Sequence, residues 1–235
     1  MLIRMLFKFG EREHLEATRS YGQLRFGSFK SYRDSENSEI GDKNEGAYRI
    51  VNSANVSLTV LNGDASESIL NGSLENVTVR EFSEISYETR IYCLYRKLVD
   101  ISKDVELSEI IDIPLFNRFG YESVLIIANV DEFYKRLDNY LSENALAYKR
   151  SCVEYKDLSN GVVEISPFVK DICYEHQSEY RVCIQKINGE EPLFINIGSL
   201  CDITQIIDKS QLARAKLIIP KLLGVAGRRQ ESESP

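Results

Sequence analysis

The sequence predicts an α+β fold with a mostly antiparallel sheet and three or four helices. Short runs rich in β-branched and aromatic residues recur along the chain, separated by turn signals such as those at residues 62–64 and 71–72. Helical periodicity is confined to a few segments, and these do not alternate regularly with the strands. A regular parallel α/β sheet is therefore not expected.

The N-terminal region predicts a strand, a helix and a second strand in close succession. The strands are expected at residues 2–9 and 23–29, and the helix at residues 11–21, ended by Gly22. Residues 31–46 contain mainly Ser, Asp, Glu, Asn and Gly, which predicts a loop. Loops of this length in compact domains are usually functional or disordered, so this loop is a first candidate for a site.

The middle of the chain predicts an antiparallel meander over residues 47–96. A short helix is expected at residues 104–112 and a buried strand at residues 123–130. Asp131 is then expected to cap a longer helix, because apolar residues recur at helical spacing from there to Leu146.

The C-terminal third predicts further strands and one short helix, at residues 210–216. The strands are expected at residues 148–155, 161–165, 170–182, 192–197, 200–207 and 217–220. Residues 1–222 are thus expected to form one globular domain, and the polar residues 223–235 a disordered tail.

Composition favours a soluble, cytoplasmic protein. The 235 residues are 43% hydrophobic and 28% charged, and no apolar run approaches the roughly 20 residues that cross a bilayer. The five cysteines are odd in number and include no Cys-x-x-Cys pair, which favours reduced thiols over disulfides. The net charge of −7 argues against a general binder of nucleic-acid backbones. No association with a membrane is expected.

Motifs for familiar chemistries are sparse. The sequence has no G-x-S-x-G, no P-loop and no G-x-G-x-x-G pattern. Cys173 and His176 are the only closely spaced Cys/His pair, and on a strand residues three apart face opposite sides, so no metal site is predicted there. Magnesium held by acidic residues of the 31–46 loop stays an alternative. Those residues are Asp34, Glu36, Glu39, Asp42 and Glu45.

The segment KDICYEHQSEYRV, at residues 170–182, is unusually rich in polar groups for a strand. On a strand, Gln177 and Glu179 would share one face, with about 6.5 to 7 Å of backbone between them. An amide and a carboxylate so placed could contact two parts of one ligand. The alternative is a solvated strand face whose charges pair with neighbouring strands.

Several segments occur in an order that resembles the AbiGi-like abortive-infection proteins and related prokaryotic families of unknown function. These segments are LFKFG, GQLRFGSFKSYRDSENSEIGDKNEG, IYCLY, EYKD and PFVKDICYEHQSEYRV, and the resemblance spans about residues 6–185. It implies a role in antiviral defence, as a toxin or effector, and a partner protein from the same defence system.

The layout is similar, more distantly, to ADP-ribosyltransferases of the diphtheria-toxin and DarT kind. That resemblance implies NAD as substrate, Glu179 as the catalytic carboxylate, Gln177 as an amide that orients the acceptor, and Tyr32 as the ring stacked on nicotinamide. The first strand departs from the pattern because LIRMLFKFG contains no histidine. Further residues implied to contact NAD are Lys8, Arg33, Asp42, Glu45, Tyr174 and Arg181.

The leading hypothesis is an ADP-ribosyltransferase-like toxin or phage-defence effector that uses NAD to modify a protein or nucleic acid. One alternative is a metal-dependent nuclease built on Asp34, Glu36, Asp42 and Glu45. The other is a non-catalytic module whose acidic surface binds a partner protein.

Overall fold

The computed structural model has an α+β fold with mostly antiparallel strand pairing, as predicted. It describes residues 2–37, 39–61, 68–102, 104–111 and 113–218, of which residues 54–61 and 68–74 are described by their backbone alone. Three described helices have seven residues or more: α1 (Arg12–Tyr21), α5 (Ile113–Phe119) and α6 (Val130–Glu143). The shorter ones are α2 (Phe29–Arg33), α3 (Glu84–Tyr87), α4 (Leu107–Ile110) and the 3₁₀ helices η1 (Ile172–Gln177) and η2 (Lys209–Arg214).

Eight strands form the main sheet. Six of them lie in the order β13 (Leu193–Asn196), β2 (Gln23–Ser28), β5 (Arg90–Asp100), β1 (Leu2–Gly10), β7 (Ser123–Ile127) and β14 (Thr204–Asp208). The other two, β12 (Glu179–Ile184) and β8 (Tyr148–Cys152), extend from β5, because β12 pairs with both β5 and β8. All pairs in this sheet are antiparallel.

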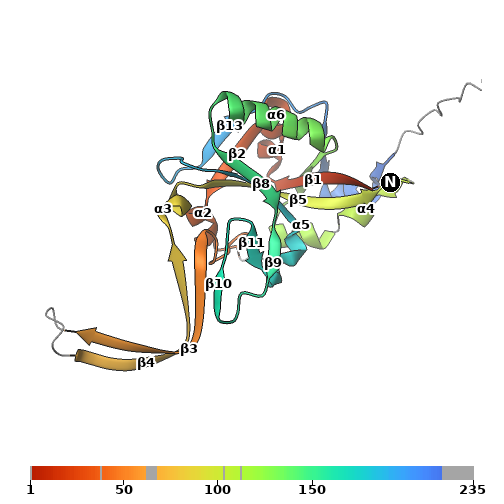
Figure 1. Cartoon of the computed structure of the whole chain (residues 1–235). Coiled ribbons are helices and arrows are strands. Elements are labelled where there is room, and N and C mark those ends of the chain that lie inside the picture. Colours follow the sequence, from red (N-terminus) through yellow and green to blue (C-terminus); the bar gives the residue numbers. More distant parts are fainter. Residues whose placement is uncertain (1, 38, 62–67, 103, 112, 219–235) are drawn as a thin grey trace, which may run out of the picture.

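Smaller sheets surround the main one (Figure 1). A long ribbon of β3 (Ala47–Leu61) and β4 (Ser68–Phe82) projects from the rest of the chain, with β10 (Val162–Glu164) paired to its base. β9 (Glu154–Lys156) and β11 (Val169–Asp171) form a parallel pair, and β6 (Val105–Glu106) pairs with β15 (Lys216–Leu217).

Helices cover both faces of the main sheet. Because side chains alternate along a strand, Leu6 and Phe7 of β1 point to opposite faces. Leu6 packs in a buried cluster with Leu15 of α1 and Leu137 of α6. Phe7 belongs to a second cluster, which contains Leu107 of α4 and residues of α5. Burial of both clusters removes a large apolar area from water and holds β1 at the centre of the fold.

The main sheet splits where β1 and β2 leave β5. β1 pairs with β5 as far as Phe7 and Tyr95, whereas β2 meets β5 only at Gly27 and Ser28. β12 occupies the other edge of β5 along Arg90–Tyr95. At residues 92–94, β5 therefore has a paired strand on one edge and an opening on the other.

Several local predictions are confirmed. The helix at residues 12–21 ends at Gly22, which adopts the left-handed conformation (φ 65°) that glycine tolerates without strain. The strands expected at 2–9, 23–29 and 123–130 are present with small changes of boundary.

Among the described residues, no helix combines the length and the apolar character needed to span a membrane.

Other local predictions are wrong. Residues 29–33 form a helix that takes in the last residue of the strand predicted at 23–29 and the first three of the loop predicted at 31–46. Residues 71–72 continue β4 instead of forming a turn. Asn129, not Asp131, caps α6, because its side chain accepts a hydrogen bond from the N–H of Glu132. The expected turn at residues 62–64 and the tail at residues 223–235 lie outside the described residues.

The prediction of a single strand over residues 170–182 is also wrong. The segment contains the end of β11, the 3₁₀ helix η1 and the start of β12. The side chain of Asp171 begins η1 by accepting a hydrogen bond from the N–H of Cys173. Ser178 then takes a left-handed conformation, with φ 40°, which redirects the chain into β12.

Candidate functional site

A cavity of about 540 Å³ opens at the split in the main sheet. This volume lies in the range of small-molecule sites. Segments distant in the sequence line it together, including Lys8 of β1, Tyr32 of α2, Cys93 of β5, Glu179 of β12 and Glu39 of the loop after α2. We refer to it below as the sheet-split cavity.

Aromatic rings form much of the cavity lining. They are Phe7, Phe9, Tyr32, Tyr92, Tyr95, Phe119, Tyr121 and Phe194. Three charged or titratable side chains on the cavity wall, Glu11, His14 and Arg25, are exposed to solvent. The arrangement suits a ligand that combines planar rings with charged groups.

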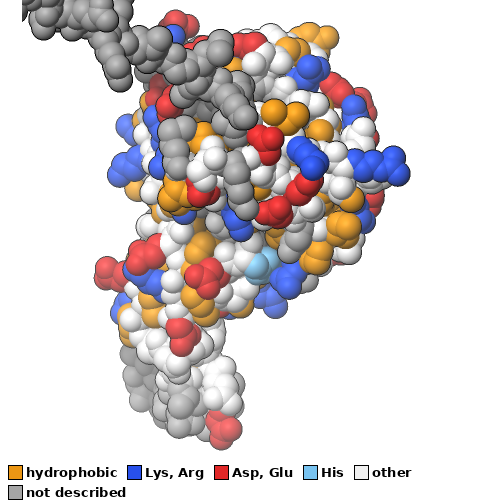
Figure 2. All heavy atoms as spheres, turned by 90° about the vertical axis from the view of Figure 1, so that its right-hand side faces the viewer, with side chains coloured by type: hydrophobic (Ala, Val, Ile, Leu, Met, Phe, Trp, Pro, Cys, Tyr) orange, Lys and Arg blue, Asp and Glu red, His pale blue; other side chains and the backbone are white. Residues whose placement is uncertain are grey.

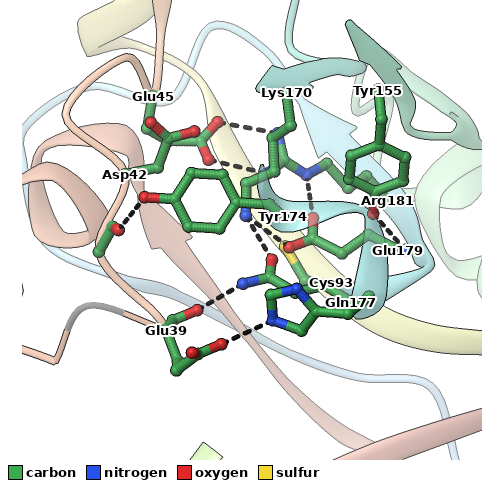
Figure 3. A network of polar contacts seen from close by, with 12 residues as sticks. Glu39, Asp42, Glu45, Cys93, Tyr155, Lys170, Tyr174, Gln177, Glu179 and Arg181 are labelled. Atoms are coloured by element: carbon green, nitrogen blue, oxygen red, sulfur yellow. Dashed lines mark hydrogen bonds and ion pairs between the residues drawn. The ribbon is translucent and has the colours of Figure 1, made fainter. Parts of the chain in front are cut away.

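Glu179 is the carboxylate held most firmly at the cavity. Its two side-chain oxygens accept hydrogen bonds from Nζ of Lys170 at 2.7 Å and from Nε of Arg181 at 2.5 Å (Figure 3). Its backbone N–H donates to the hydroxyl of Tyr155 at 2.8 Å. Burial by itself would raise the pKa of this group, but the two cations lower the pKa of Glu179 to about 2. The carboxylate is therefore ionised at neutral pH although only 11% of the side chain is exposed.

Arg181 links Glu179 to a second buried carboxylate, that of Glu45. Its two terminal nitrogens bind both oxygens of Glu45, at 2.8 and 2.7 Å. Burial raises the pKa of Glu45 more than Arg181 and Lys170 lower it, and the nearby negative charge of Asp42 raises it further. The guanidinium thus ties the loop that carries Glu45 to β12.

Gln177 and Lys170 extend this network to the loop after α2. Nζ of Lys170 donates to Oε1 of Gln177 at 2.7 Å, and Nε2 of Gln177 donates to the backbone carbonyl of Glu39 at 2.6 Å. The ammonium of Lys170 also lies 4.8 Å from the ring centre of Tyr174. Gln177 is 2% exposed, so its amide is enclosed and both of its ends are bonded.

Two more contacts fasten residues 39–41 to η1. Nε2 of His176 lies 2.7 Å from a carboxylate oxygen of Glu39, and the hydroxyl of Tyr174 donates to the carbonyl of Gly41 at 3.0 Å. Glu39 and Ile40 themselves line the cavity. Figure 3 shows Glu39 beside Gln177, with the dashed contacts running on to Lys170. We call residues 39–41 the latched segment.

The structure brings most of the predicted site residues together. Six of the nine line the cavity: Lys8, Tyr32, Glu45, Gln177, Glu179 and Arg181. Residues of the 31–46 region and of the 170–182 region thus line the same cavity. Gln177 and Glu179 do not share a strand face, because Gln177 ends η1. They converge instead on one atom, Nζ of Lys170.

The remaining three predicted residues lie outside the cavity lining. Arg33 donates to the carbonyl of Glu45 and stacks on the ring of Phe82. Asp42 is buried and accepts a hydrogen bond from the N–H of Asn44, so it stabilises a turn. Tyr174 supports Lys170 and the latched segment. These three residues support the site from outside the cavity and are not placed to contact a ligand within it.

Sequence reasoning missed Lys170, Arg25 and His14. Lys170 begins the polar segment 170–182, and its place in the same segment as Gln177 and Glu179 is a signal that could have identified it. Arg25 and His14 carry no such signal, because their place in the cavity wall depends on how β2 and α1 pack beside the split.

Lys8, Cys93 and Tyr32 are titratable groups in the cavity wall. Burial lowers the pKa of Lys8, whose Nζ donates to the backbone carbonyl of Cys93 at 2.9 Å. Burial raises the pKa of the Cys93 thiol to about 12 and the pKa of Tyr32 well above its ordinary value. Since the thiolate is the reactive form, Cys93 is not prepared for nucleophilic attack at neutral pH.

The acidic residues of the 31–46 region do not converge on one point. Asp34 and Glu36 are exposed, whereas Asp42 and Glu45 are buried and bound to the protein as described above. Within the described residues, no three His, Cys, Asp or Glu side chains are grouped as ligands of one metal ion. The prediction that Cys173 and His176 face opposite sides of a strand is wrong. Both lie on η1, where Nδ1 of His176 contacts the carbonyl of Cys173.

Charges of both signs are interspersed on the face shown in Figure 2. The described residues on that face therefore present no continuous basic surface of the kind that follows a phosphate backbone.

Comparisons with protein-family models, with curated proteins and with solved structures found no match to this chain. The two family resemblances therefore stay predictions.

Proposed function

We propose that the chain binds NAD in the sheet-split cavity and cleaves the bond between nicotinamide and ribose, with Glu179 as the catalytic carboxylate. Departure of nicotinamide leaves positive charge on the ribose, and a fixed carboxylate stabilises that charge where it develops. The observation that carries the proposal is a carboxylate, ionised by two buried cations, in the wall of an aromatic-lined cavity.

The nature of the leaving group suits this site. The ring nitrogen of nicotinamide is positively charged in NAD, so nicotinamide leaves as a neutral molecule and needs no proton. Glycosides with alcohol leaving groups need a carboxylic acid as proton donor, with a raised pKa. Glu179 has a lowered pKa, so it can stabilise a cation but cannot supply that proton.

The rest of the cavity offers partners for the other parts of NAD. Tyr32 can stack on the nicotinamide ring, and Phe119 and Tyr121 on the adenine ring. Lys8 and Arg25 provide positive charge for the pyrophosphate. Each group is thus assigned by its chemistry, an aromatic ring for a ring and a cation for a phosphate.

The biological role proposed is that of a cytoplasmic toxin or phage-defence effector. This part rests on the resemblance to abortive-infection proteins. Consumption of NAD would stop the metabolism of the host cell, which is a sufficient effect for such an effector. A partner protein from the same defence system would then inhibit this activity.

The test is the release of nicotinamide from NAD by the purified chain, measured by chromatography. Glu179→Gln keeps the size of the side chain and removes its charge, and we expect it to lower the rate on the order of 100-fold or more. Glu154→Gln is the matched control, because Glu154 is an exposed glutamate on β9, and its rate should equal that of the wild type.

Equal release by the wild type and Glu179→Gln would contradict the proposal. Binding of NAD without any release would favour the non-catalytic alternative. A circular dichroism spectrum of each variant shows whether the fold is retained, so that loss of activity is not confused with unfolding.

A further inference from the structure

Lys170 and Arg181, which donate to the carboxylate of Glu179, and Gln177, which accepts from Lys170, each have further bonds within the chain. Gln177 uses its carbonyl oxygen for Lys170 and its NH₂ group for Glu39. Arg181 divides its donors among Glu179, Glu45 and the carbonyl of Pro167. Gln177, the residue implied to orient the acceptor, therefore has both ends of its amide occupied and is not free to orient a second large substrate.

The latched segment also limits access. Glu39 and Ile40 form part of the cavity wall, and three hydrogen bonds from η1 hold residues 39–41 in place. Lys170 and Gln177, which lie between this segment and Glu179, are 3% and 2% exposed. A side chain of another macromolecule would have to enter the cavity that the dinucleotide itself occupies. A water molecule needs only about 30 Å³.

We infer that the acceptor in this reaction is water, so that the chain is an NAD glycohydrolase and does not transfer ADP-ribose to a protein or nucleic acid. The inference rests on the proposed function and specifies its second substrate. It also revises the role of Gln177, which is a positioning residue for Lys170 and the latched segment.

The reaction balances with water alone. The bond between the ribose C1′ and the nicotinamide nitrogen breaks, and its electron pair neutralises the charge on that nitrogen. The oxygen of water forms a new bond to C1′ and loses a proton to the solvent. Because Glu179 is too weak a base to accept this proton firmly, its role is to stabilise the cationic ribose. The products are nicotinamide, ADP-ribose and one proton.

The experiment uses the wild-type chain, NAD labelled in its adenine ring, and an extract that contains protein and nucleic acid. Nicotinamide release, free ADP-ribose and label in acid-precipitated macromolecules are measured in the same sample. We expect free ADP-ribose to equal the nicotinamide released, and the label in macromolecules to stay at the background of the Glu179→Gln control.

Label in protein or nucleic acid above that background, with free ADP-ribose falling short of nicotinamide, would overturn the inference and leave the proposed cleavage standing. Absence of nicotinamide release would overturn the proposed function and this inference with it. Should Glu179→Gln fail to fold, a sample without the chain gives the background instead.

Discussion

At the scale of single residues, Glu179 and Glu45 show how partners decide the charge state of a buried carboxylate. Both bind Arg181, yet the pKa of Glu179 is lowered and that of Glu45 is raised. Glu179 also has Lys170 as a second direct partner, whereas Glu45 has the negative charge of Asp42 nearby. Glu179, whose pKa is lowered, is the one in the position proposed for catalysis.

This difference predicts a pH dependence of stability. The pKa of Glu179 is about 2 in the folded chain and 4.5 in its ordinary state, so its ionised form stabilises the fold above about pH 4.5. That contribution, on the order of 3 kcal/mol, is lost as the pH falls from about 4.5 towards about 2. Urea unfolding should therefore show a stability gap between wild type and Glu179→Gln that narrows over this range.

The same measurement on Glu154→Gln serves as the control. Its carboxylate is exposed, so its stability should follow that of the wild type at every pH. A gap between wild type and Glu179→Gln that stays constant through acid would show that Glu179 does not titrate at a lowered pKa.

At the scale of elements, the attachment of the latched segment to η1 depends on Gln177. Gln177→Ala removes the donor to the carbonyl of Glu39 and the acceptor for Lys170, so we expect a loss of about 1 to 3 kcal/mol in the free energy of unfolding. Amide hydrogen exchange at residues 39–41 should become faster. Glu175→Ala, at an exposed position on η1, should change neither quantity. Unaltered exchange in Gln177→Ala would mean that the segment is held by other contacts.

The end of α1 provides a test of the fold near the cavity. Gly22 has a positive φ, and a Cβ added there would lie 2.1 Å from the carbonyl oxygen of Gly198. Gly161 has nearly the same φ, 67°, but no atom lies within 4 Å of such a Cβ. Both alanine substitutions incur the left-handed strain of about 1 to 2 kcal/mol, and Gly22→Ala should lose about 1 to 3 kcal/mol more through the clash. Thermal unfolding measures both, and equal losses would contradict the close packing at Gly22.

At the scale of the whole molecule, local signals predicted some elements well. Helical spacing and a terminal glycine located α1, and helical spacing also located α6. The prediction of a single strand at residues 170–182 is wrong because alternating polar and β-prone residues fit a 3₁₀ turn as well as a strand. The cap at Asp171 and the left-handed Ser178 are visible only in the structure.

The candidate site was predictable as a pairing of two segments, but its shape was not. The family resemblance implied that Glu45 and Glu179 belong to one site. The cavity, however, exists because β1 and β2 leave β5 at different points, and this depends on pairings between residues far apart in the sequence. The position of Lys8 at this split follows from the same pairings.

The most direct test of NAD binding at Glu179 is a crystal structure of the wild-type chain with an NAD analogue whose nicotinamide–ribose bond cannot be cleaved. We expect the analogue to fill the sheet-split cavity, with its nicotinamide ring on Tyr32 and the ribose C1′ facing the carboxylate of Glu179. An analogue bound elsewhere, or a nicotinamide ribose turned away from Glu179, would contradict it.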